Sequence, residues 1–155
     1  MERIAVFPGS FDPFTLGHES IVNRSLSLFD KIYIVVGYNS KKEGYFTVEK
    51  RMEWINKVYK NNNRIIVDSY SGLTVDFCKR VHAKYILRGL RTSSDFEYER
   101  TIAQLNRAMA VEIESVFLLT TPELTPINST IVREIIRHGG DAQKFVPAQI
   151  DLSDV

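Results

Sequence analysis

Five short apolar runs, separated by segments with helical periodicity, restrict the folds that are open to this chain. The runs are rich in β-branched residues and occupy residues 4–7, 31–37, 64–69, 85–88 and 115–119. Four of them are almost continuously apolar, which is typical of strands covered on both faces. Strands that alternate with helices form right-handed βαβ units and hence a parallel sheet. The pattern therefore predicts an α/β protein with a single doubly wound, five-stranded parallel sheet.

Five helices are expected between and after these strands, because apolar residues recur there every three or four positions. They are predicted over residues 19–29, 47–59, 73–81, 94–111 and 131–137. Thr47 and residues 128–130 offer N-caps for two of them, and residues 94–97 (SDFE) have the spacing of a capping box. Core positions are predicted for four aromatic residues, Trp54, Tyr59, Phe77 and Phe96. The tail after residue 147 is weakly patterned, and a short helix or a loose segment is expected there.

Composition argues for one domain and against several classes of partner. A chain of this size buries roughly 70% of its unfolded surface, so residues 1–155 are predicted to form a single domain. The 20 basic and 19 acidic residues do not favour a nucleic-acid partner. Cys78 is the only cysteine, and neither a signal peptide nor an apolar run of membrane length is evident. A cytoplasmic location without membrane contact is therefore expected.

The loops at the carboxyl ends of the strands are the expected ligand site, because open parallel sheets bind ligands at that edge. The first of these loops, residues 9–18 (GSFDPFTLGH), leads from a buried strand to a helix N-terminus. Free backbone N–H groups and the helix dipole make such a terminus an anion site, to which His18 adds a directed donor. A capped helix with an incidental histidine is the plainer interpretation. The clustering of Gly and Pro in the turn favours a phosphate-binding loop. It is of another kind than the two common ones, because neither the dinucleotide-binding GxGxxG motif nor the P-loop motif GxxxxGK[ST] is present.

Cationic side chains occupy two of the other loops. Lys41 and Lys42 follow the second strand, where the alternative to a phosphate contact is an ordinary solvated loop. Arg88 and Arg91 lie in an RGLR turn after the fourth strand, and guanidinium groups bind phosphoryl oxygens bidentately. Salt bridges to the acidic residues of the following helix are the alternative there. Residues 127–130 bring a second helix N-terminus to the same edge.

Other chemistries find no support in the sequence. His82 and His138 lack metal-ligand spacing, and no Cys/His cluster indicates a zinc site, so no metal bound by the protein alone is expected. No GxSxG elbow or Ser-His-Asp order indicates nucleophilic hydrolysis.

Three segments together carry a resemblance to a known family. Residues 9–18 resemble the first signature of the nucleotidyltransferase superfamily, in which T/H-x-G-H follows the first strand. Residues 127–133 (INSTIVR) are similar to its second signature, usually I-S-S-T-x-V-R. Residues 88–99 with the Asn-Arg pair at 106–107 narrow the resemblance to the bacterial phosphopantetheine adenylyltransferases. The resemblance implies a Rossmann-like nucleotidyltransferase fold.

The same resemblance implies an activity and a set of site residues. The reaction would transfer adenylyl from ATP to 4'-phosphopantetheine, giving dephospho-coenzyme A and pyrophosphate in the penultimate step of coenzyme A synthesis. It implies Mg²⁺ as cofactor, a homohexamer, and coenzyme A as a feedback ligand. The implied catalytic residues are His18, Lys42 and Arg91. The implied acceptor-binding residues are Ser10, Lys42, Thr74, Arg88 and Asn106. The implied nucleotide-binding residues are Ser10, Phe11, His18, Gly89, Leu90, Arg91, Glu99, Leu124, Thr125, Pro126, Ile127, Asn128, Ser129 and Thr130.

Two departures and two alternatives accompany this interpretation. Ser10 replaces the commoner Thr, and Asn128 replaces the first Ser of the second signature. A sister enzyme that uses CTP or another phosphorylated acceptor is one alternative, but such enzymes carry R-T-x-G-I-S-T-T where this chain has residues 126–130. A non-catalytic nucleotide-binding module is the other, and the joint presence of four donor residues argues against it. These are His18, Lys42, Arg88 and Arg91.

Overall fold

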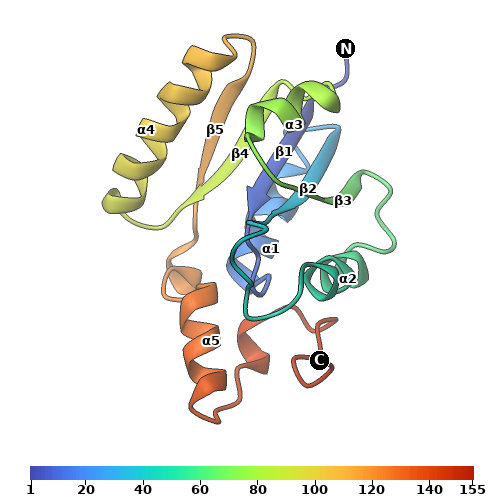
Figure 1. The fold of residues 1–155 in the computed structure, drawn as a ribbon, viewed down its shortest axis with the longest axis vertical. Helices are drawn as coiled ribbons and strands as arrows, with labels where there is room; N and C mark the ends of the chain where they lie inside the picture. The colour runs from blue at the N-terminus through green and yellow to red at the C-terminus, as the bar shows by residue number, and fades with distance from the viewer.

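The strands are the ones that the apolar runs predict, and all are parallel. The computed structural model describes residues 1–155. Its strands are β1 (Ile4–Gly9), β2 (Lys31–Gly37), β3 (Ile65–Tyr70), β4 (Tyr85–Leu90) and β5 (Glu114–Leu119). They form one five-stranded sheet in the order β3-β2-β1-β4-β5 (Figure 1). Because the order reverses at β1, the predicted doubly wound α/β fold is confirmed.

The helices lie where the periodicity predicts them, with shifts at their ends. They are α1 (Leu16–Ser25), α2 (Val48–Val58), α3 (Thr74–Arg80), α4 (Ser93–Met109) and α5 (Ser129–Arg137), with short 3-10 turns at Pro122–Leu124 and Gln143–Phe145. Thr47 and Asn128 cap α2 and α5 by accepting backbone N–H groups. The capping box of α4 pairs Thr92 with Asp95, so the prediction from residues 94–97 was two residues late. Helix α1 likewise starts at Leu16 rather than residue 19, which places His18 in its first turn.

Each face of the sheet is covered by a separate apolar layer, because alternate strand residues point to opposite sides. Ala5, Phe7 and Ile34 pack with residues of α1, α2 and α5. Val6 and Val35 pack on the other face with residues of α3. The central strands are therefore covered on both faces, as near-continuous apolar strands require.

Three of the four predicted core aromatics are buried, and one is not. Trp54, Tyr59 and Phe77 are buried. Phe96 is 41% exposed, so its predicted core position is wrong. The reason is that α4 buries a single residue, Glu99, and faces a cavity rather than a filled apolar layer. Phe96 instead meets Phe117 of the edge strand β5 edge-on.

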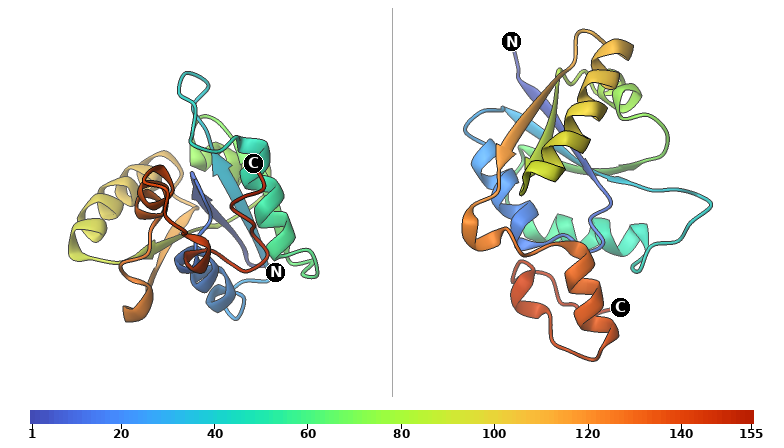
Figure 2. Two further views of the ribbon diagram at one scale, coloured as in Figure 1. Left: turned by 90° about the horizontal axis from the view of Figure 1, so that it is seen from below. Right: turned by 90° about the vertical axis from the view of Figure 1, so that its left-hand side faces the viewer.

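Helix α5 and the chain that follows it lie across the carboxyl ends of the strands. Figures 1 and 2 show this segment at the opposite end of the molecule from the N-terminus. The side chain of Ser129, at the start of α5, donates to the carbonyl oxygen of Pro13 at 2.8 Å. This contact closes α5 over the loop between β1 and α1. No helix has both the length and the apolar character needed to cross a bilayer.

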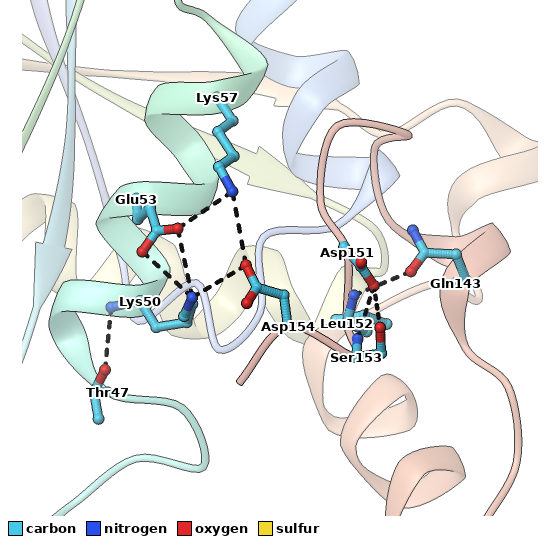
Figure 3. Close-up of polar contacts among 9 residues, drawn as sticks. All are labelled: Thr47, Lys50, Glu53, Lys57, Gln143, Asp151, Leu152, Ser153 and Asp154. Carbon is cyan, nitrogen blue, oxygen red and sulfur yellow. Dashed lines mark hydrogen bonds and ion pairs between the residues drawn. The ribbon is translucent and has the colours of Figure 1, made fainter.

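The C-terminal tail is neither helical nor loose, contrary to both expectations. Ile150 is fully buried, and the Gln143 side chain holds the tail by donating to the Ile150 carbonyl and accepting from Leu152 N–H at 3.1 Å. Asp154 then pairs with two lysines of α2, Lys50 at 3.4 Å and Lys57 at 3.8 Å (Figure 3). The tail therefore links the 3-10 turn at Gln143–Phe145 to α2. It has no period because its contacts are with two different elements.

Removing the buried anchor of this tail tests how much it contributes to stability. Ile150→Ala is expected to lower the free energy of unfolding by about 2–5 kcal/mol, since it deletes fully buried methyl and methylene groups and leaves a cavity. Urea unfolding followed by circular dichroism measures the change. Asp154→Ala is the control and should change stability far less, because exposed ion pairs contribute little. Equal effects of the two variants would contradict a packed tail.

Candidate active site

Three cavities meet at Ser10, at the point where β1 ends. A cavity of about 550 Å³ lies between the β1–α1 loop, the start of α5 and the Arg88–Arg91 turn. A second, of about 270 Å³, lies between β4, α3 and α4. The third and largest, about 1000 Å³, lies between the loop after β2 and α5. Ser10 lines all three, so groups bound in different cavities would come together at this residue.

The turn after β1 is shaped by a buried aromatic ring. Phe11 has a φ of 47°, a left-handed conformation that non-glycine residues rarely adopt, and its side chain is 2% exposed. A Cβ on Gly9 would lie 2.8 Å from that ring, so only glycine fits beneath it. The ring also meets His18 edge-on, with centroids 4.9 Å apart. Phe11 thus positions the imidazole, a role for which the sequence gives no local signal.

His18 is held as a neutral donor. Its Nδ1 accepts the backbone N–H of Thr15 at 2.9 Å, which completes a capping box for α1. Because Nδ1 accepts, the proton of the neutral ring is on Nε2, the nitrogen left for a ligand in the 550 Å³ cavity. Burial first, and then the charges of Arg88 and Arg91, lower the His18 pKa from 6.5 to about 3. The ring therefore stays neutral at physiological pH.

The two arginines of the RGLR turn are held by carboxylates of α4. Arg88 donates Nε and Nη2 to Glu99 at 2.9 and 2.7 Å, and it also donates to the Pro8 carbonyl. Arg91 pairs with Asp95 at 3.2 Å. The salt bridges considered in the sequence as an alternative are thus present. They do not remove the arginines from the site, because both still line the 550 Å³ cavity.

The second signature closes the same cavity from the opposite side. Residues 127–131 line it, and the Ile127 carbonyl lies 3.6 Å from where a Cβ on Gly17 would be. The N-termini of α1 and α5 therefore face one another, as an anion site requires. The Asn128 side chain accepts the Ile131 N–H at 2.9 Å, so this departure from the family pattern serves as the cap of α5.

Other predicted site residues are divided among the cavities. Gly89 and Glu99 line the 550 Å³ cavity with the residues above. Thr74, Arg88 and Asn106 line the 270 Å³ cavity. Lys42 lines the largest one, and its amino group makes no ion pair in the structure. Four predicted nucleotide-binding residues line none of the three cavities, namely Leu90, Leu124, Thr125 and Pro126. Leu90 is buried, because the last residue of β4 turns its side chain into the core.

Three polar residues of the site were not assigned in the sequence. Arg133 lines two of the cavities and donates to the Asp12 carbonyl at 2.7 Å. Its place one turn after Ser129 on α5 is a signal that helical spacing offers. Asp12 and Arg51 are buried and make an ion pair across 3.8 Å. No local pattern links these two, since they lie on separate elements.

Residues 6–135 match the model of the cytidylyltransferase-like family, and the chain belongs to that family. The chain is 50% identical over 150 residues to phosphopantetheine adenylyltransferase of Bacteroides fragilis, covering 97% of this chain and 99% of that protein. It is 48% identical over 147 residues to the protein of that name from Leptospira biflexa, covering 95% and 92%. The chain therefore belongs to the phosphopantetheine adenylyltransferase family, as its motifs predicted.

Solved structures of lower identity share the fold. A bifunctional NMN adenylyltransferase/ADP ribose pyrophosphatase from Francisella tularensis superposes with a TM-score of 0.70 at 19% identity, over 94% of this chain. This chain spans 45% of that protein's length. A structure from Vibrio parahaemolyticus gives a TM-score of 0.67 at 20% identity, over 96% of both chains. The predicted nucleotidyltransferase fold is confirmed.

The lowered pKa of His18 predicts a pH-dependent loss of stability. The unfolded state takes up a proton below about pH 6.5, whereas the folded state does so only near pH 3. The stability linked to neutral His18 is therefore fully present above pH 6.5 and is lost as the pH falls toward 3, by at most about 1.4 kcal/mol per pH unit. Urea unfolding between pH 7 and 4 should show a shallower decline for His18→Gln than for the wild type. Identical slopes would contradict a buried neutral ring.

Proposed function

We propose that the chain transfers the adenylyl group of ATP to 4'-phosphopantetheine, giving dephospho-coenzyme A and pyrophosphate. The observation that carries this is identity near 50%, over almost the whole chain, to proteins named phosphopantetheine adenylyltransferase. The cavities support it, since a site for a nucleotide and a site for an elongated acceptor meet at Ser10.

The proposed reaction depends on positioning of the two substrates and needs no general base. The acceptor is a phosphate monoester whose second pKa is about 6, so it is already largely ionised at neutral pH. Its oxygen forms a bond to the α-phosphorus of ATP while the bond from that phosphorus to the bridging oxygen breaks, and pyrophosphate leaves with the electron pair. What the protein supplies is alignment of the two substrates and stabilisation of the charge on the transferring group.

His18 is the proposed transition-state donor. Its Nε2–H faces the cavity that would hold the triphosphate, and its Nδ1 is fixed by Thr15. A neutral donor adds no net charge to the ground state. Its hydrogen bond strengthens as negative charge grows on the α-phosphoryl oxygens. Arg91, beside it, is proposed to hold the leaving phosphates.

The remaining assignments follow the cavities. The acceptor would extend from Lys42 and Arg88 at its phosphate to Thr74 and Asn106 along its arm, with Ser10 at the junction. ATP would lie against the two facing helix N-termini. Its proposed contacts are Ser10, Phe11, His18, residues 89–91, Glu99 and residues 124–130. Leu90 and residues 124–126 would act there through their backbone or through movement of the loop.

Glu99 has a second proposed role. It lines both the nucleotide and the acceptor cavity, and its carboxylate already receives two hydrogen bonds from Arg88. A carboxylate in that position holds the guanidinium plane in one orientation. Besides contacting ATP, Glu99 would thus aim Arg88 at the acceptor phosphate.

Mg²⁺ is proposed to enter with ATP. No group of three or more His, Cys, Asp or Glu side chains is arranged to hold a metal ion. Mg²⁺ usually keeps several waters and binds through substrate phosphates, so the phosphates of ATP would hold it here. When bound, the ion neutralises phosphate charge. The protein's contribution is the arginines and helix N-termini around it.

Several further expectations remain proposals. They are action as a single nucleotidyltransferase domain over residues 1–155, a homohexamer, a cytoplasmic location and feedback by coenzyme A. They rest on the resemblance and on composition.

The decisive test compares nucleotides directly. Purified protein with Mg²⁺ and 4'-phosphopantetheine should release pyrophosphate with ATP, and far less with CTP. Preference for CTP would favour a sister cytidylyltransferase. Release with neither nucleotide, together with retained ATP binding, would favour a binding module.

His18→Ala is expected to lower kcat by about 10²–10³-fold, as removal of an oxyanion donor does. ATP affinity, measured by calorimetry without acceptor, should change little because the hydrogen bond matters most in the transition state. Equal losses in turnover and in ATP binding would make His18 a ground-state anchor instead.

Lys42→Ala is expected to raise KM for 4'-phosphopantetheine, with a smaller effect on KM for ATP. The reason is that Lys42 makes no ion pair and lines a cavity that meets the proposed acceptor cavity at Ser10. Steady-state kinetics with each substrate varied in turn measures both constants. Lys41→Ala, in the same loop, is the control. An unchanged KM for 4'-phosphopantetheine in Lys42→Ala would favour the alternative, in which this loop is an ordinary solvated loop.

A further inference from the structure

Asp12 joins the first-signature turn to the segment that follows Lys42. The residue is 7% exposed, although it is charged. One carboxylate oxygen accepts the N–H of Tyr45 at 2.7 Å, and the other accepts the N–H of Phe46 at 2.9 Å. Each carboxylate oxygen therefore binds a backbone amide that lies 33 or 34 residues further along the chain. Such a use of a buried carboxylate is costly unless its charge is balanced.

Arg51 of α2 supplies the balancing charge and a second tie. Its guanidinium lies 3.8 Å from Asp12 and is 5% exposed. Nε donates to the Phe46 carbonyl at 3.0 Å, and Nη1 donates to the Ser10 carbonyl at 2.7 Å. One rigid, planar group therefore sets the separation between residues 10 and 46.

The surrounding chain leaves this pair little room to move. A Cβ on Gly44 would lie 2.6 Å from the Arg51 guanidinium and 2.9 Å from the Asp12 carboxylate. The Asp12 carbonyl is also held by Arg133 of α5. The turn, the loop after β2, α2 and α5 all meet at these two residues.

We propose that Asp12 and Arg51 are positioning residues for the adenylyl transfer. They hold the Lys42 loop against the Ser10 turn, so that the acceptor phosphate is presented in line with the α-phosphorus. Neither residue touches the substrates. The inference rests on the proposed function and on the proposed role of Lys42, and it adds the device that places Lys42.

The kinetic test uses Arg51→Met, with Arg51→Lys as the conservative variant. Arg51→Met should lower kcat/KM for 4'-phosphopantetheine by about 10–100-fold per folded molecule, because misplacement of about 1 Å is enough for such a loss. ATP binding without acceptor should stay within about 2-fold. Arg51→Lys should recover part of the loss. Ile55→Ala, fully buried one turn further along α2, is the matched control for destabilisation alone.

A readout independent of activity is hydrogen exchange at the amides that Asp12 holds. Asp12→Asn and Arg51→Met should speed exchange at Tyr45 and Phe46 while leaving the amides of β2 unchanged. In Ile55→Ala the two amides should keep their protection relative to β2. Unchanged exchange in the Asp12 and Arg51 variants would overturn the inference, even if one of them folds poorly.

A double variant separates this inference from the proposed function. If Arg51 acts through Lys42, Lys42→Ala/Arg51→Met should be scarcely slower than Lys42→Ala, because the effects of coupled residues are not additive. Fully additive losses, or losses equal to those of Ile55→Ala, would overturn the positioning role while wild-type activity stood. Absence of pyrophosphate release by the wild type would overturn the proposed function itself.

Discussion

The reversal of strand order at β1 is the constraint on which the site depends. The chain leaves β1 toward α1 on one face of the sheet, and it leaves the neighbouring β4 toward α4 on the other. The loops after these two strands therefore diverge and leave a crevice between them. His18, in the first turn of α1, lines one side of this crevice, and Arg88, near the end of β4, lines the other. Burial of the sheet on both faces fixes the strand ends, so the crevice needs no ligand to form it.

The elements that could be predicted from the sequence are those whose signal is local. Near-continuous apolar runs located every strand, since a strand buried on both faces has no polar alternation. The start of α4 was misplaced because residues 94–97 imitate a capping box, while Thr92 and Asp95 form the real one. Phe96 was misjudged for a different reason. Its helix covers a cavity, and a hydrophobic stripe does not reveal what lies opposite it.

In the candidate site, too, residues with a local sequence signal were predicted, whereas contacts between distant residues were not. His18 was found from the turn that leads from β1 to α1, and Arg88 and Arg91 were found from the cationic segment at the end of β4. The salt bridge of Arg88 to Glu99 was anticipated only as the alternative to a phosphate contact, and the pair of Arg51 with Asp12, 39 residues apart, could not be found from any local pattern. The C-terminal tail is similar, since Asp154 reaches α2 only in three dimensions (Figure 3). Sequence thus identifies groups suited to phosphate chemistry, but not the contacts that orient them.

Electrostatics within the crevice links binding to catalysis. The arginines at 88 and 91 are the proposed phosphate-binding groups, and the same two charges help to keep His18 neutral. A protonated His18 would attract the triphosphate already in the ground state, which would tighten ATP binding without speeding transfer. A neutral ring whose Nδ1 is occupied by Thr15 donates in one direction only. Its contribution is then greatest when charge accumulates on the α-phosphoryl oxygens. In the proposed mechanism, the cations that would hold the substrates thereby also preserve the neutral His18 that the chemical step would use.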